Sequence, residues 1–341
     1  MTVLKSKRTP LGDPEWPINV VTLKMIPSPE GNPATSSAAP RYCLITPCRD
    51  EAKYARVTLN SIAAQTVRPT LWVIVDDGST DETPHLLADF AAKHDWVRVV
   101  RREDRGKRKV GPGVIDAFYA GYRTIDPTDF DFVCKIDLDL DLPPLYFQRM
   151  IEKMQANPRL ATVSGKPYMD LHGQLVSEKC GDENSVGMIK FYRTRAFEQI
   201  GGFVPQVMWD GIDGHRCRML GWQAQSVDEP DTRFVHLRPM GTSQQNWWTG
   251  RVRHGFGQYF MGTSLTYMLA SCAFRLLHPP ALVGSLAMLW GWVRSAVDEA
   301  PRYDDPGFRE FLRRYQTACL IEGKRQATAR FDADGANRWR G

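Results

Sequence analysis

The chain of 341 residues carries 43% hydrophobic and 11% aromatic side chains, which excludes a disordered polymer and allows one large hydrophobic core or two smaller ones. Its formal net charge of +5 permits contact with anionic lipid or nucleotide phosphates, but because no base-reading motif is present we expect no nucleic-acid partner. Seven cysteines without a CxxC pair, and an N-terminus that lacks the apolar core of a secretory signal, predict a reducing, cytoplasmic location.

Residues 1–40 are rich in Pro, Ser, Gly and Ala, which predicts an extension with little core of its own. From residue 41 onward, apolar runs alternate with segments of helical spacing. Strands are predicted at 41–47, 71–75, 96–100 and 131–136, and helices at 49–65, within 79–94, and at 113–125 and 143–158. The helix within 79–94 carries a capping pair, Ser79 and Glu82, at its start. The alternation predicts an α/β fold with a mostly parallel, doubly wound sheet.

Polar segments follow three of the predicted strands. They are 47–51, the pair Asp76 and Asp77, and 137–141. In a doubly wound sheet, ligands bind beyond the carboxyl ends of the strands because loops and helix N-termini converge there. The coincidence of the three segments indicates a ligand site at this edge of the sheet. For the pair Asp76 and Asp77, an ordinary Asp-Gly turn with a helix cap is the alternative.

The segment "KIDLDLDLPP" places Asp137, Asp139 and Asp141 at alternate positions directly after an apolar strand. On an extended chain, residues i and i+2 face the same side about 6.5 Å apart, so these carboxylates repel each other unless a cation lies among them. Oxygen ligands suit Mg²⁺ or Mn²⁺, which takes one or two protein carboxylates plus substrate phosphates. A metal-diphosphate site is one interpretation, and an edge strand with a solvated acidic face is the other.

The stretch "CLITPCRDEAKYARVTLNSIAAQTVRPTLWVIVDDGSTDET", followed by "KIDLDLDLPP", resembles the GT-A domain of family 2 nucleotide-sugar glycosyltransferases, from about Tyr42 to Gly262. The resemblance implies a Rossmann-like GT-A fold, which we expect over 41–245, with a C-terminal helical extension at 246–341. It also implies an inverting transfer, dependent on Mn²⁺ or Mg²⁺, of a sugar from a nucleoside diphosphate. We expect a UDP-sugar donor first and a lipid-linked or polysaccharide hydroxyl as acceptor.

The resemblance also assigns residues to the donor. By position, Pro47 and Glu51 would contact the nucleoside and Asp77 its base, and Arg49 and Asp76 are expected beside them.

The expected metal ligands follow from the same family. Asp139 would ligate the metal and Asp137 would contact the ribose or the metal, whereas Asp141 lies outside the usual DxD pair. A histidine after the next predicted strand, His236 in "RFVHLRP", is the third expected ligand. A buried or surface histidine without a metal is the alternative.

The family further implies a catalytic base on an acidic motif before a helix. In the matching stretch, "MWDGIDGHRCRMLGW", Arg216 and Gly221 align with the usual Arg and Gly and place Asp210 at the base position. Trp209 stands where the family usually has Glu. Asp213, one helical turn on, is the competing candidate, and either aspartate could instead be a helix N-cap.

The basic stretch 105–113, "RGKRKVGPG", is predicted to hold the phosphates or shape the sugar pocket through Lys107, Arg108 and Gly113, because glycines allow close backbone approach. A solvated surface loop is the alternative. Gly187 resembles the glycine loop beside the donor sugar. Arg251 lies in a region similar to the QxxRW region of processive relatives, although "WTGRVRHG" departs from that motif.

Residues 247–293 combine tryptophans, arginines and apolar helical faces. The apolar run 279–293 is shorter than the roughly 20 residues that cross a bilayer, so we expect no membrane span. One prediction is a helix in the interface of an anionic leaflet, which would be a peripheral contact at the cytoplasmic face of the membrane. The other is a pair of core helices packed on the sheet.

Two further functions fit the same aspartates. The first is a nucleotide-sugar-binding protein without catalysis. The second is a phosphatase or nucleotidyltransferase, but the acidic segment is not followed by the Thr or Val of a haloacid-type phosphatase, and no Gly-rich nucleotidyltransferase signature opens the first strand.

Overall fold

The computed structural model describes residues 39–341 except 105, 107–110, 239–246 and 277–280. Residues 40–341 form one compact unit. The predicted extension 1–40 lies, apart from its last two residues, outside the described residues.

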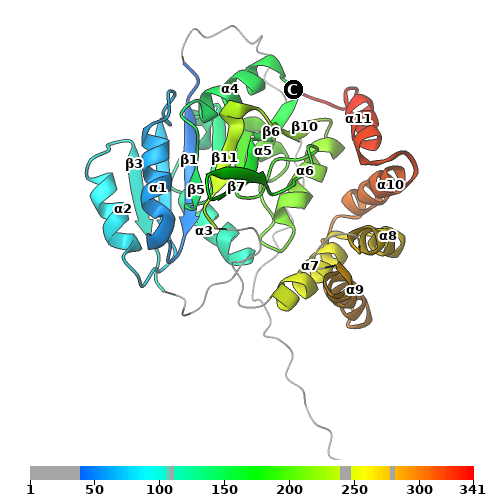
Figure 1. Cartoon of the computed structure of the whole chain (residues 1–341). Coiled ribbons are helices and arrows are strands. Elements are labelled where there is room, and N and C mark those ends of the chain that lie inside the picture. Colours follow the sequence, from blue (N-terminus) through cyan, green and yellow to red (C-terminus); the bar gives the residue numbers. More distant parts are fainter. Residues whose placement is uncertain (1–38, 105, 107–110, 239–246, 277–280) are drawn as a thin grey trace, which may run out of the picture. The chain divides into compact units, whose positions relative to one another are not determined.

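A seven-stranded sheet forms the centre of this unit (Figure 1). In pairing order its strands are β10 (Gln223–Ser226), β6 (Leu160–Ser164), β9 (Ile189–Arg193), β4 (Phe132–Ile136), β1 (Tyr42–Cys48), β2 (Leu71–Asp76) and β3 (Val97–Arg101). Strand β9 runs antiparallel to both of its neighbours, and the other pairs are parallel. The prediction of a mostly parallel sheet is confirmed.

Helices cover both faces of this sheet, because the apolar residues of each strand alternate between two cores. Tyr42 and Leu44 belong to one core, and Cys43 and Ile45 to the other. The first core is completed by α1 (Ala52–Ala63), α2 (Thr83–Ala91) and α4 (Tyr146–Ala156). The second is completed by α3 (Pro112–Tyr122), α5 (Thr194–Gln199) and α6 (Trp209–Met219).

The start of α2 differs from the prediction. The helix begins at Thr83, its N-cap is Glu82, and no side chain caps it there. Ser79 instead lies in the preceding turn, where its backbone N–H donates to Asp76 Oδ1 at 2.8 Å and its hydroxyl accepts from the Asp50 N–H at 2.9 Å. The predicted Ser79–Glu82 capping pair is therefore wrong, because Ser79 is already used to close the turn after β2.

A second, four-stranded sheet lies beyond the carboxyl end of β4. Its order is β5 (Leu140–Asp141), β11 (Arg233–His236), β7 (Lys166–Leu171) and β8 (Gln174–Ser177). Leu140 pairs with His236, and the Leu237 N–H donates to the Asp139 carbonyl at 2.9 Å. This pairing joins the acidic segment 137–141 to a strand almost 100 residues later, which the spacing in the sequence does not reveal.

The last five helices gather away from β3 and α2 (Figure 1). They are α7 (Trp247–Met261), α8 (Leu265–Arg275), α9 (Ala281–Val297), α10 (Pro306–Glu322) and α11 (Lys324–Gly335). Helices α7 and α9 cross closely, since a Cβ at Gly255 or Gly291 would overlap the backbone of the other helix. Phe308 and Leu312 of α10 pack against Ile212 of α6, so this helical region shares a core with the sheet domain.

No helix among the described residues is long and apolar enough to span a bilayer.

Candidate active site

A cavity of about 660 Å³ lies at the carboxyl ends of β1, β2 and β4. The predicted site residues that line it are Pro47, Arg49, Glu51, Asp77, Gly113, Asp137, Asp139, Gly187, Asp210 and His236. Asp76, Asp213 and Arg251 do not line it. Lys107 and Arg108 lie outside the described residues. Residues from widely separated parts of the chain thus surround one space, as expected for the ligand-binding edge of such a sheet.

At one end of the cavity, charged side chains hold the loops after β1 and β2 together. Arg49 donates to the Asp77 carbonyl at 3.1 Å and pairs with Asp104 at 2.6 Å. The Asp77 carboxylate pairs with Arg102 at 2.9 Å. Asp76 has a different role: it is 1% exposed and its Oδ1 closes the turn to Ser79. This arrangement leaves Asp77, rather than Asp76, at the cavity wall.

The three aspartates of the acidic segment have three different environments. Asp137 Oδ1 accepts from Lys135 Nζ at 2.5 Å, and a third of its side chain is exposed. Asp139 is buried, and burial together with the negative charge of Asp137 raises its pKa. Asp141 is exposed, and its backbone pairs with Val235. Only Asp137 and Asp139 therefore face the cavity.

Asp139 and His236 form the candidate metal position. His236 Nε2 lies 3.9 Å from Asp139 Oδ2, and its Nδ1 lies 2.8 Å from Glu178 Oε2. Burial lowers the pKa of His236. The hydrogen bond to Glu178 and the charge of Asp139 together raise that pKa by more than burial lowers it, so the net shift is upward. Asp139 Oδ1 is buried with no hydrogen-bond partner among the residues that the structure describes. An oxygen of this kind is suited to a cation.

Arg238 is a cation already present at this position, which the sequence reading missed. Its guanidinium contacts the Glu51 carboxylate, lies 3.3 Å from Asp139 Oδ2, and sits over the Tyr54 ring. Over the described part of the chain, no three or more His, Cys, Asp and Glu side chains are arranged to hold a metal ion. The carboxylate with its unused oxygen is nevertheless a ligand type that suits Mn²⁺ or Mg²⁺, whereas the imidazole beside it is a ligand type more usual for Zn²⁺, Fe²⁺, Cu²⁺ or Ni²⁺.

The start of α6 forms a further part of the cavity wall. This helix follows Met208, whose φ of 70° is unusual for a residue with a side chain. The Asp210 side chain lies against Gly187, where an added Cβ would come within 2.7 Å of Asp210 Oδ2. Met208 is the N-cap, so neither Asp210 nor Asp213 caps the helix. Because Gly187 has no side chain, it leaves the space that the Asp210 carboxylate occupies.

Asp213 is 1% exposed, and both oxygens of its carboxylate accept hydrogen bonds. Both oxygens accept from Lys190 Nζ, at 2.9 and 2.7 Å, and Oδ2 also accepts from the Tyr192 hydroxyl at 2.5 Å. Oδ1 accepts from the Gly214 N–H. Burial raises the pKa of Asp213 and the Lys190 charge opposes that rise. A carboxylate held this way is a buried ion-pair partner, and it does not face the cavity.

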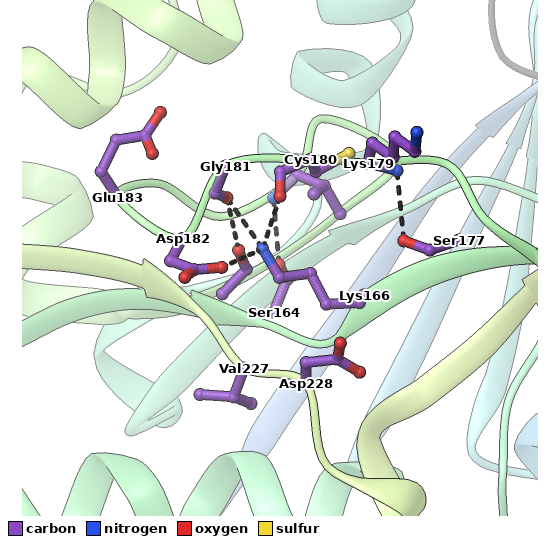
Figure 2. A network of polar contacts seen from close by, with 12 residues as sticks. Ser164, Lys166, Ser177, Lys179, Cys180, Gly181, Asp182, Glu183, Val227 and Asp228 are labelled. Atoms are coloured by element: carbon purple, nitrogen blue, oxygen red, sulfur yellow. Dashed lines mark hydrogen bonds and ion pairs between the residues drawn. The ribbon is translucent and has the colours of Figure 1, made fainter. Parts of the chain in front are cut away.

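A connecting segment, 178–188, supplies another part of the cavity wall. Figure 2 shows how Lys166 of β7 holds it: Nζ donates to the carbonyls of Cys180 at 2.8 Å and Gly181 at 2.9 Å and pairs with Asp182 at 2.6 Å. Arg218 of α6 donates to the Glu183 carbonyl. Buried cations thus fix the backbone of this wall.

Several cavity residues were not predicted from the sequence. They are Lys135, Asn184, Met208, Trp209, Arg238, Arg253 and His254. Burial lowers the pKa of His254 to about 4, so its imidazole is neutral near pH 7. For Lys135 the available sequence signal was a lysine inside an apolar strand, in "FVCKI". Such lysines are rarely buried without a specific partner.

Comparison with known families supports the sequence resemblance. Residues 43–199 match the family model described as Glycosyl transferase family 2. Poly-beta-1,6-N-acetyl-D-glucosamine synthase of Staphylococcus epidermidis is 30% identical over 124 residues, which cover 35% of this chain and 27% of the relative. The same synthase of Staphylococcus aureus is 28% identical over 123 residues, with the same two shares. The chain thus matches about a quarter of the length of these relatives.

Two solved structures share the fold. One, S. aureus TarS 1-349 in complex with UDP-GlcNAc, has a TM-score of 0.51 at 13% identity and covers 87% of this chain and 89% of that chain. The other, GalNAc-T7 with UDP, GalNAc and Mn²⁺, has a TM-score of 0.50 at 12% identity and covers 81% of this chain and 56% of that chain. At such identities the likeness concerns the fold alone, and the expected GT-A fold class is confirmed.

Proposed function

We propose that this chain, which carries a glycosyl transferase family 2 domain, moves a sugar from a nucleoside diphosphate to an acceptor hydroxyl by a single displacement that inverts the anomeric carbon. One observation carries the proposal: Asp77, Asp139 and Asp210, which come from three separate parts of the chain, line the same cavity. A donor bound at Asp77 and Asp139 and a base at Asp210 would then share one space, into which the acceptor hydroxyl could enter.

The donor end fits a nucleoside diphosphate with a divalent cation. Asp139 and His236 would hold Mn²⁺ or Mg²⁺, with Asp137 on the metal or the ribose. This is supported by Asp139 Oδ1, which has no hydrogen-bond partner within the described parts of the chain. When bound, the metal would neutralise the charge that develops on the diphosphate, so the leaving group needs no protein acid. Arg238 would have to leave Asp139 or share it with the metal.

A UDP-sugar is the donor to test first. TarS is described in complex with UDP-GlcNAc, GalNAc-T7 with UDP and GalNAc, and the curated relatives are synthases of poly-N-acetylglucosamine. UDP-GlcNAc is therefore the first candidate, and a polysaccharide or lipid-linked sugar hydroxyl is the acceptor we propose.

Asp210 is the proposed base. A base must reach the proton that it removes, and the Asp210 side chain lines the cavity whereas Asp213 is buried in an ion pair. Asp210 would accept the proton of the acceptor hydroxyl as the oxygen attacks the anomeric carbon.

The test is hydrolysis of UDP-GlcNAc by the purified chain, in which water replaces the acceptor. We expect UDP release that depends on Mn²⁺ or Mg²⁺ and stops with EDTA, and an α-linked donor should give the β-sugar at first. Binding of UDP with Mn²⁺ but no hydrolysis or transfer would instead favour a nucleotide-sugar-binding protein. Release of UMP and a sugar phosphate would indicate cleavage inside the diphosphate.

We also propose that α8 and α9 contact a membrane surface, which would bring a lipid-linked acceptor to the site. Helix α9 exposes four apolar side chains at spacings of four to seven residues, so they form one apolar stripe. They are Leu282, Leu286, Trp290 and Val297. Leu265 and Leu269 of α8 are exposed in the same way. Arg294 beside the α9 stripe is more than half exposed and can meet lipid phosphates.

Co-sedimentation with vesicles that contain phosphatidylglycerol tests this contact. We expect binding at low salt that weakens in 1 M salt, where charges are screened over about 3 Å. Leu286→Glu with Trp290→Glu should abolish it, and Leu175→Glu, at an exposed position on β8, is the matched control. Equal binding by the control and the stripe variant would reject the contact.

A further inference from the structure

Two buried lysines lie directly opposite each other in the central sheet. Lys135 of β4 and Lys190 of β9 are paired in register and are 2% and 0% exposed. Directly opposed residues of antiparallel strands point to the same face with their Cβ atoms about 5 Å apart, and like charges there destabilise a sheet. Burial adds the cost of desolvating both ammonium groups. Folding alone gives no reason for this pair.

Each lysine has its own carboxylate partner, and each also bonds a backbone carbonyl of a residue that lines the cavity. Lys135 Nζ bonds Asp137 at 2.5 Å and the Gly187 carbonyl at 2.9 Å. Lys190 Nζ bonds both oxygens of Asp213 and also the backbone carbonyl of Asp210, at 3.0 Å. The first lysine therefore holds the acidic segment, and the second holds the first turn of α6.

The Trp209 ring links the two lysines. Lys135 Nζ lies 5.2 Å and Lys190 Nζ 5.8 Å from its centroid, within the range of a cation–π contact. Trp209 precedes Asp210, and Asn184 Nδ2 donates to the same Asp210 carbonyl at 2.8 Å. The backbone of the proposed base is thus fixed by two donors and by an aromatic ring between two cations.

We propose that Lys190 is a positioning residue that, acting with Lys135 across Trp209, sets the distance between the base Asp210 and the acidic segment that holds the donor. Lys190 does not touch the substrate, since it is fully buried and does not line the cavity. Asp213 serves as its counter-charge. This inference rests on the proposed function, because the role of Asp210 as the base is part of that proposal.

The test removes the positioning bond without leaving a lone buried charge. In Lys190→Met with Asp213→Asn, both members of the ion pair become neutral, so the penalty for an unpaired buried ion is avoided. We expect UDP-GlcNAc hydrolysis to slow on the order of tenfold to a hundredfold, as for a base displaced by about an ångström. The Kd for UDP with Mn²⁺, measured by calorimetry, should change less than threefold.

Tyr192→Phe is the matched control. It removes the hydroxyl bond to Asp213 but keeps the Lys190 bond to Asp210, so the melting temperature should fall while the hydrolysis rate stays within twofold. Lys135→Met should also slow hydrolysis. When Lys135→Met is combined with the Lys190 and Asp213 changes, the hydrolysis rate should fall little more than in the slower of the two parent variants. The reason is that both lysines act through the same ring.

Three results would overturn the inference: a wild-type rate in the Lys190 and Asp213 variant, a rate loss that follows a weaker UDP–Mn²⁺ affinity, or an equal rate loss in Tyr192→Phe. A wild-type rate in Asp210→Asn would be different, because it would reject the proposed base itself and, with it, any positioning role toward that base.

Discussion

The two acidic segments, 137–141 and 210–213, look alike in sequence, but the structure uses their carboxylates differently. In the first, Asp139 is buried at the cavity with one oxygen that has no hydrogen-bond partner among the described residues. In the second, Asp213 is buried with both oxygens occupied by Lys190, Tyr192 and a backbone N–H. Burial by itself therefore does not mark a functional carboxylate. The unused oxygen at a cavity wall is the more informative feature.

The largest effect should come from the aspartate that faces the cavity in the second segment. Asp210→Asn removes the proposed base, so donor hydrolysis should fall by a hundredfold or more, since a positioned base contributes about 10² to 10⁴. The affinity for UDP with Mn²⁺ should remain within threefold. Rates compared at saturating donor, together with calorimetry, separate these two effects. A weaker affinity with an unchanged rate would place Asp210 in the donor site.

The next largest effect should come from Asp139, in the first acidic segment. Asp139→Asn removes the carboxylate that would hold the metal, so the Mn²⁺-dependent part of UDP binding should weaken about tenfold to a hundredfold, while the melting temperature without metal stays close to that of the wild type. Calorimetric titration with UDP, with and without Mn²⁺, measures it. Asp137→Asn should have a smaller effect, because Asp137 is partly exposed and already paired with Lys135.

Asp213→Asn should lower the stability of the fold more than the rate of hydrolysis. It leaves Lys190 fully buried without its counter-charge, which costs about 3–5 kcal/mol in comparable pairs. We expect a lower midpoint of urea unfolding, and a hydrolysis rate reduced less than tenfold where the variant is folded, because Lys190 still bonds the Asp210 carbonyl. A hundredfold loss of rate with normal stability would transfer the base to Asp213.

The smallest effect should come from Asp141, the third aspartate of the first segment. It is exposed at the edge of the second sheet and outside the cavity. Asp141→Asn should therefore leave both UDP–Mn²⁺ affinity and hydrolysis within twofold. A tenfold change in either would show that the whole acidic segment, and not only Asp137 and Asp139, serves the donor.

By itself, the sequence was enough to predict the alternation of β1 to β4 with α1 to α4 and the acidic segment after β4, because hydrophobic periodicity and strand-end loops are local signals. The family resemblance added Gly187, Asp210 and His236, which line the cavity, and Arg251, which does not. The capping pair at Ser79 was wrong because a turn closed by Asp76 competed for the same residue.

Only the tertiary structure decided how those residues meet. The approach of His236 and Arg238 to Asp139 depends on β11 pairing with β5, and the opposition of Lys135 and Lys190 depends on β9 entering the sheet antiparallel beside β4. The burial of Asp213, on which the proposal of Asp210 as the base rests, depends on β9 and α6 enclosing it together. Each is a contact between segments far apart in the chain. Such contacts follow from the order in which distant strands pair, which the periodicity within one segment does not specify.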